Sequence, residues 1–218
     1  MTAELARTLL AGGAEVQWVP VVHAREATPP PPAGIHSFGG SVLTSAPLHR
    51  VERGTLDLPL ESSLTRELRA RPVDAMVHIG AGARGSVNLL WIADRMGVPP
   101  FAIVRADEVV CQRGDLVHAT GNACANFEDP VRCGRCCTAS WLRRAAASEV
   151  QNRLELLIAS LQVARGVIVR EEREAKMLEQ AGVPRRNLLL AAPEDAARVL
   201  AERLLAGPTR SPSLTRRD

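Results

Sequence analysis

Aromatic residues are scarce in this sequence: it has no tyrosine, three phenylalanines and three tryptophans, together 3% of 218 residues. Proteins that bind single-stranded nucleic acid stack the bases on aromatic side chains. The basic pairs at 143–144 and 185–186 have no aromatic residues interleaved with them, and the formal net charge is only +3. We therefore expect no nucleic-acid partner.

Long apolar runs are also missing. No stretch approaches the roughly 20 apolar residues that a transmembrane helix needs. The first residues, Met1-Thr-Ala-Glu-Leu5, lack the basic and apolar segments of a signal peptide. The sequence therefore predicts a cytoplasmic protein with no transmembrane segment. Lys176 is the only lysine, and this arginine bias is typical of a GC-rich bacterial genome rather than of a phosphate-binding surface.

Cysteine is absent outside a single segment, residues 111–137, which holds all five: Cys111, Cys124, Cys133, Cys136 and Cys137. Four thiolates hold Zn²⁺ tetrahedrally, and C-x-x-C is a common chelating pair. The first four are therefore candidate ligands of a structural zinc ion, and Cys137 is left over because adjacent cysteines seldom share one site. Reduced thiols and disulfides are the alternatives, and a cytoplasmic location disfavours disulfides. A thioredoxin-like role is disfavoured because the C-x-x-C does not directly follow a strand.

Alternating apolar and amphipathic segments predict an α/β fold, with a doubly wound, mostly parallel, Rossmann-like sheet. We expect helices over 2–11, 60–70, 87–96, 139–161, 171–181 and 194–205, and strands over 15–22, 75–79, 101–105, 166–169 and 188–190. These form one domain, 1–206, with a cysteine-rich loop at 106–138 and a disordered tail at 207–218.

A glycine loop follows the strand expected at 75–79. Gly80-Ala-Gly82-Ala-Arg84-Gly85 matches G-x-G-x-x-G, and Asp107 ends the next strand, near where a ribose-binding acid is expected. One hypothesis is therefore an NAD(P)- or other nucleotide-binding module. The plainer interpretation is that small residues let the helix pack closely on the sheet. This loop and the cysteine segment both follow carboxyl ends of strands, where ligands bind in such sheets.

The segment 71–137 contains Cys111-Gln-Arg113-Gly114-Asp-Leu116, followed by Cys124, Cys133 and Cys136. It resembles the amino-terminal, acceptor-side domain of glycosyltransferase family four, which has the two-lobed GT-B fold and a "C-RG-L" element followed by further cysteines. Weaker similarity covers most of residues 3–190. The resemblance implies glycosyl transfer from a sugar nucleotide to a hydroxyl of a glycan or small-molecule acceptor. It also implies a donor-binding domain as partner.

The candidate substrate-binding residues are Gly80, Gly82 and Arg84 of the glycine loop, together with Arg105 and Asp107 after the next strand. Arg105 stands where the family has a histidine, and an arginine cannot act as a general base near neutral pH. The family's first strand and its "GG-E" loop would precede Glu4, so we expect an incomplete enzyme or one that depends on a separate donor domain. A third hypothesis is a non-catalytic, zinc-stapled binding module.

Two further patterns have ordinary explanations. Glu171 and Glu179 have the E-x7-E spacing of the family's donor site, but they lie on the helix expected at 171–181, so we expect a solvated charged face. His78 matches a family histidine in the strand before the glycine loop. A lone histidine there is more often a half-buried structural residue than a catalyst.

Overall fold

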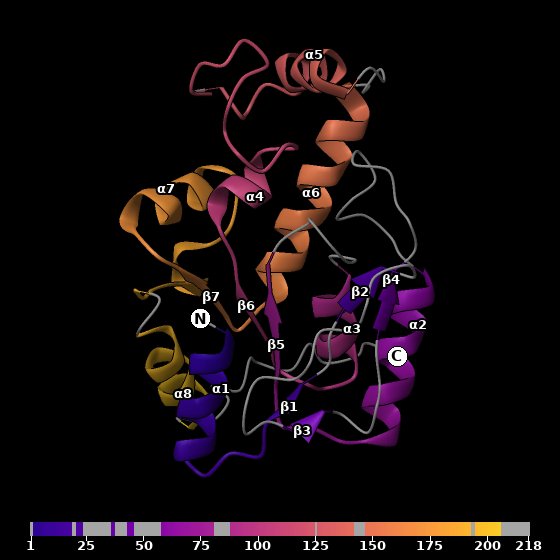
Figure 1. Ribbon diagram of the computed structural model, residues 1–218, viewed down its shortest axis with the longest axis vertical. Coiled ribbons are helices and arrows are strands. Elements are labelled where there is room, and N and C mark those ends of the chain that lie inside the picture. Colours follow the sequence, from indigo (N-terminus) through magenta and orange to yellow (C-terminus); the bar gives the residue numbers. More distant parts are fainter. Residues whose placement is uncertain are drawn as a thin grey trace, which may run out of the picture.

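The computed structural model describes residues 2–18, 21–23, 36–37, 43–45, 58–80, 88–124, 126–141, 147–192 and 195–205. Its centre is a sheet of four parallel strands in the order β5-β6-β7-β8 (Figure 1). The strands are β5 (Met76–Ile79), β6 (Pro100–Ile103), β7 (Gly166–Val169) and β8 (Leu188–Leu190). Every residue of β6 and β7 is buried. Central strands of a parallel sheet are apolar on both faces because helices cover both sides.

Helices cover the two faces of this sheet. The first face packs against α3 (Leu89–Arg95), α6 (Ala147–Val163) and α7 (Glu172–Gln180), and the second against α1 (Thr2–Ala11) and α8 (Ala196–Leu205), which lie side by side in Figure 1. Alternate residues of β6 serve the two faces. Ala102 belongs to the first core and Phe101 to the second, as the two-residue period of a strand requires. The result is a three-layer, Rossmann-like α/β arrangement.

The elements outside the main sheet are short or peripheral. Helix α2 (Leu58–Ala70) packs against α3, and a 3-10 turn, Arg185–Asn187, precedes β8. Two small parallel pairs join β1 (Gln17–Trp18) to β3 (His36–Ser37) and β2 (Val21–His23) to β4 (Leu43–Ser45). The strand expected over 15–22 is thus described as two short strands. No helix in the described part of the chain is both long and apolar enough to cross a bilayer.

The structure corrects the predictions for residues 106–161. The helix expected over 139–161 is two helices, α5 (Pro130–Trp141) and α6. Asp129 starts α5, since its Oδ1 accepts hydrogen bonds from the backbone N–H groups of Val131 at 2.9 Å and Arg132 at 3.1 Å. Aspartate at the N-cap followed by proline is a strong helix start. The expected loop at 106–138 therefore contains α4 (Ala106–Val110) and the first two turns of α5.

Helices cover both faces of the sheet, as a doubly wound fold requires, and the reversal of strand order stays a prediction. A doubly wound sheet reverses its strand order at a switch point, whereas the four described strands of the main sheet follow one another in sequence order. Residues 81–87, which include Gly82, Arg84 and Gly85 of the glycine loop, lie outside the described residues, as does the whole expected tail at 207–218.

Candidate thiol site beyond the carboxyl end of strand β6

Cys111 is placed by the short helix that follows β6. Arg105 is the N-cap of α4, and Cys111 is its C-cap residue. The Cys111 backbone N–H donates to the carbonyl oxygen of Asp107 at 3.0 Å, which closes the last turn of α4. Only 9% of Cys111 is exposed, so its thiol is largely shielded from solvent.

Cys124 comes from a hairpin-like turn, residues 116–124. Its N–H donates to the carbonyl oxygen of Leu116 at 2.7 Å, and His118 N–H donates to Asn122 at 2.8 Å. Gly121 has φ +88°, a left-handed conformation that permits the tight reversal. Leu116 packs against the main core, so the turn that carries Cys124 is anchored to the sheet.

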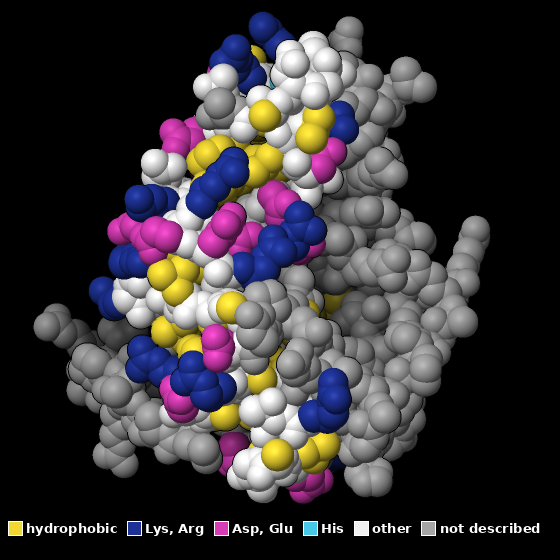
Figure 2. Space-filling view, turned by 60° about the vertical axis from the view of Figure 1, so that its left-hand side comes forward, with side chains coloured by type: hydrophobic (Ala, Val, Ile, Leu, Met, Phe, Trp, Pro, Cys, Tyr) yellow, Lys and Arg dark blue, Asp and Glu magenta, His cyan; other side chains and the backbone are white. Residues whose placement is uncertain are grey.

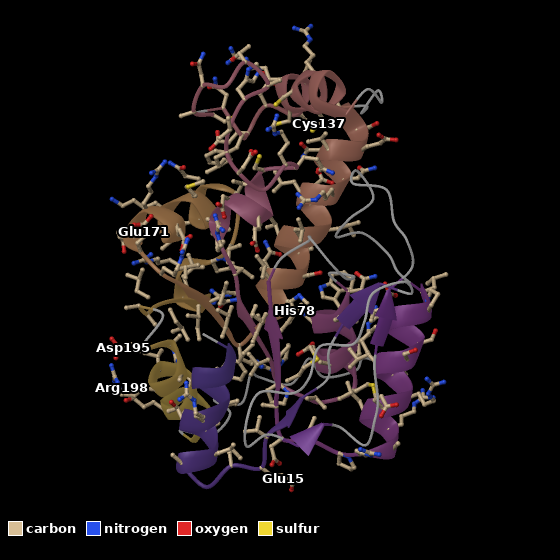
Figure 3. All side chains as sticks on the ribbon, viewed as in Figure 1. Glu15, His78, Cys137, Glu171, Asp195 and Arg198 are labelled. Atoms are coloured by element: carbon tan, nitrogen blue, oxygen red, sulfur yellow. The ribbon has the colours of Figure 1, made fainter. Side chains whose placement is uncertain are left out.

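Helix α5 supplies the remaining three thiols. The Sγ atom of Cys133 lies 3.8 Å from the carbonyl oxygen of Phe127, to which it donates a weak hydrogen bond. Cys137, one turn further along, is 1% exposed and packs against Val150 of α6. Cys137 therefore belongs to the packing between the two helices, at the top of the molecule in Figure 3.

All five cysteines line one cavity of about 230 Å³. Its polar lining includes Arg113, His118, Asn122, Asn126 and Arg132. The five cysteines form no disulfide with one another. Within the described residues, no three His, Cys, Asp or Glu side chains already stand together as a metal-binding group. The predicted ligands Cys111, Cys124, Cys133 and Cys136 thus share a cavity without being assembled around one point.

Burial keeps two of these thiols protonated. Desolvation raises the pKa of Cys133 to about 11, and the nearby Cys124, Cys111 and Cys136 add to the shift. Desolvation and neighbouring thiols likewise raise the pKa of Cys137 to about 12, although the Arg153 guanidinium acts in the opposite direction. The thiolate is the nucleophilic form of cysteine. A role for either residue as a nucleophile at neutral pH is therefore disfavoured.

Arg153 is a part of the site that the sequence analysis missed. It lies on α6 with 4% of its surface exposed, and its guanidinium donates to the carbonyl oxygens of Val109 at 3.1 Å and Glu108 at 2.9 Å. Burial lowers its pKa to about 10, and the nearby Cys111 and Cys137 oppose that shift. The sequence does contain a signal for this burial, because Arg153 lies in the apolar stripe of α6, three residues after Val150.

A second polar feature lies between the sheet and the thiol cavity. The guanidinium of Arg105 pairs closely with the carboxylate of Asp107, and its Nε donates to Oδ1 at 3.0 Å. Gly80, at the end of β5, donates its N–H to the carbonyl oxygen of Ile103 at 2.9 Å. The hydrogen bond with Asp107 raises the pKa of Arg105. The structure thus brings three of the five predicted substrate-binding residues to adjacent strand ends, whereas Gly82 and Arg84 lie outside the described residues.

The remaining candidates have the ordinary roles expected of them. Glu171, the N-cap of α7, and Glu179 are both exposed, which confirms the solvated face. On the face shown in Figure 2, basic and acidic side chains are interspersed. His78 lies on β5 opposite Ala102, and burial lowers its pKa. It therefore favours the neutral form and belongs to the packing of the sheet.

No protein-family model, curated protein or solved structure matches this chain.

Proposed function

We propose that this chain forms the acceptor-side lobe of a glycosyltransferase-like protein of the GT-B type. The reaction is transfer of a glycosyl group from a sugar nucleotide to an acceptor hydroxyl. The donor-binding domain comes from a partner or from another part of the same protein. Two features support the proposal: the three-layer α/β architecture, and the position of the Cys111–Leu116 motif beyond the carboxyl end of β6.

The observation that carries the proposal is the Arg105–Asp107 pair beside Gly80. The Arg105 side chain is 49% exposed and that of Asp107 is 16% exposed. The pair lies at the carboxyl ends of β5 and β6, where ligands of parallel α/β sheets bind. A guanidinium supplies several N–H donors in a plane, and a carboxylate supplies only acceptors. Side by side, they match neighbouring sugar hydroxyls, each of which both donates and accepts.

Arg105 acts in binding rather than in proton transfer. Its pKa, raised by the hydrogen bond with Asp107, keeps the guanidinium charged at every physiological pH. The lobe therefore holds and orients the acceptor through charge-assisted hydrogen bonds. A group outside this pair removes the proton from the acceptor hydroxyl.

The test is direct binding of the chain to an array of immobilised saccharides, with parallel thermal-shift measurements against UDP-sugars, GDP-sugars and NAD(P)H. We expect saccharide binding that Arg105→Gln weakens by about tenfold or more, because charge-assisted hydrogen bonds are worth about 1.5–3 kcal/mol. Arg198→Gln is the matched control. It breaks an arginine–aspartate pair of α8, with Asp195 at 3.1 Å, on an exposed surface away from the strand ends (Figure 3).

Two outcomes would contradict the proposal. One is stabilisation by NAD(P)H without saccharide binding, which would support the nucleotide-binding alternative. The other is saccharide binding that Arg105→Gln and Arg198→Gln leave equally unchanged.

A further inference from the structure

Thiols from three separate segments meet at one cavity: Cys111 from the end of α4, Cys124 from the turn 116–124, and Cys133 with Cys136 from α5. These segments are connected to each other by irregular chain, which does not fix their relative positions by itself. We propose that these four thiols bind a single zinc ion as a structural site. This site is separate from the Arg105–Asp107 pair and does not depend on the proposed function.

The chemistry of the donors selects the metal. Thiolate sulfurs are soft ligands that favour zinc and similar ions over magnesium or calcium. Four of them complete a closed tetrahedral shell, with zinc–sulfur distances of about 2.3 Å, as structural sites require. The cavity of about 230 Å³ leaves the side chains room to close around one ion. The turn that carries Cys124 has exposed residues at its tip, and we expect it to move inward on binding.

The charge balance of the site is favourable. Zn²⁺ displaces the thiol protons of its four ligands to solvent, and the resulting tetrathiolate centre has a charge of −2. Two guanidinium groups, those of Arg113 and Arg153, lie near enough to interact electrostatically with Cys111. Arg153 is buried within the protein. Its positive charge there offsets negative charge on thiolates that solvent does not reach well.

The neighbouring acidic groups already have other partners. Asp115 pairs with Arg113 at 3.0 Å. The carboxylate of Asp129 accepts the N–H groups at the start of α5, as described above. Neither carboxylate is therefore required as a ligand, and the four thiols form the complete set.

The remaining cysteine that lines the cavity, Cys137, is set aside as a ligand. Cys137 packs against Val150 with 1% exposure and directly follows Cys136. The fifth cysteine therefore serves as an internal control rather than as an alternative ligand.

The test is titration of the reduced, metal-free full chain with Co²⁺, followed by displacement with Zn²⁺. We expect one Co²⁺ per chain, with thiolate-to-cobalt charge-transfer bands and the intense visible bands of a tetrahedral site. Stoichiometric Zn²⁺ should remove both sets of bands. Because this measurement uses the unmodified protein, it does not depend on whether any variant folds.

Variants then assign the ligands. Cys124→Ser and Cys136→Ser should weaken Co²⁺ binding by more than about 100-fold. Substitution of residues that only hydrogen-bond to the ligands already lowers metal affinity about 10- to 100-fold. Cys137→Ala should retain the stoichiometry and the spectrum. The proposal is overturned by absence of charge-transfer bands in the wild-type titration, or by equal losses in Cys137→Ala and Cys124→Ser. Saccharide binding through Arg105 is measured separately, so failure of one proposal does not imply failure of the other.

Discussion

The guanidinium of Arg153 donates a hydrogen bond to the carbonyl oxygen of Val109 across a sequence separation of 44 residues. A second bond goes to Glu108, so one buried arginine of α6 satisfies two carbonyl groups in the last turn of α4. The last carbonyl groups of a helix have no partner within the helix itself. Arg153 therefore fixes the end of α4, and with it the position of Cys111.

Replacement of this arginine should destabilise the protein. Arg153→Met keeps much of the buried side-chain volume but removes both donors, and buried groups left without a partner cost about 1–3 kcal/mol. We expect a loss of that size in the free energy of unfolding, measured by urea denaturation. Arg198→Met, the same change at an exposed ion pair, should leave the urea midpoint unchanged. Equal midpoints for the wild type and Arg153→Met would show that the buried guanidinium has no such role.

Asp129 should be important for the start of α5. Asp129→Ala removes the oxygen that accepts the N–H groups of Val131 and Arg132. Loss of an N-cap typically costs about 0.5–2 kcal/mol, measurable by chemical denaturation. Asparagine caps helices about as well as aspartate, so Asp129→Asn should retain most of the stability. A variant Asp129→Ala as stable as Asp129→Asn would contradict this account.

The protein should become less stable as the pH is lowered below neutrality, because His78 is harder to protonate in the folded state. Burial lowers the pKa of His78 below its usual value of 6.5, so the folded state binds this proton less readily than the unfolded state. The free energy of unfolding begins to decrease as the pH falls through 6.5, and it decreases further until the pH passes the lower pKa of the folded state. We expect a lower melting temperature at pH 5 than at pH 7.5, and a smaller difference in His78→Gln. His118→Gln is the control, and an unchanged difference in His78→Gln would refute the prediction.

A side chain at Gly166 should destabilise the protein. A Cβ atom at this position would stand 2.7 Å from Cδ1 of Leu189 and 3.2 Å from Cδ1 of Phe101. Overpacking of a core costs about 1–3 kcal/mol, so Gly166→Ala should lower the free energy of unfolding by about that amount. Gly12→Ala, where the new Cβ would approach no atom closer than 3.4 Å, should behave like the wild type. A Gly166→Ala variant with wild-type stability would mean that the Leu189 and Phe101 side chains shift at little cost to admit the methyl group.

Local sequence patterns predicted strands β7 and β8 and helix α7 well. The bounds expected for β7 and β8 agree with the structure, because each is a short apolar run that begins directly after a polar residue, Arg165 or Asn187. Helix α7 was expected within one residue of its observed ends. The start of α5 was missed because its Cys-Gly-Arg-Cys-Cys sequence lacks an apolar period, although Asp129-Pro130 is a recognisable start signal.

The thiol site was predictable in its composition but not in its surroundings. The clustering of cysteines in the sequence indicated that they belong together, and the structure places all five around one cavity. The buried position of Arg153 depends on how α6 packs against the end of α4. The apolar stripe of α6 indicates that Arg153 is buried, but its hydrogen-bond partner lies 44 positions away, and no local pattern of the sequence identifies that partner.

The strand order also has a consequence for how this protein reaches its native state. Each strand of the main sheet pairs with the next along the chain, so the sheet can grow from β5 onward as the chain is synthesised. Residues 80–99 separate β5 from β6, whereas residues 104–165 separate β6 from β7, a segment about three times as long. Each doubling of loop length adds about 0.6 kcal/mol to the entropic cost of closure. Docking of β7 is therefore the costlier association, and it must wait until the entire cysteine segment has left the ribosome.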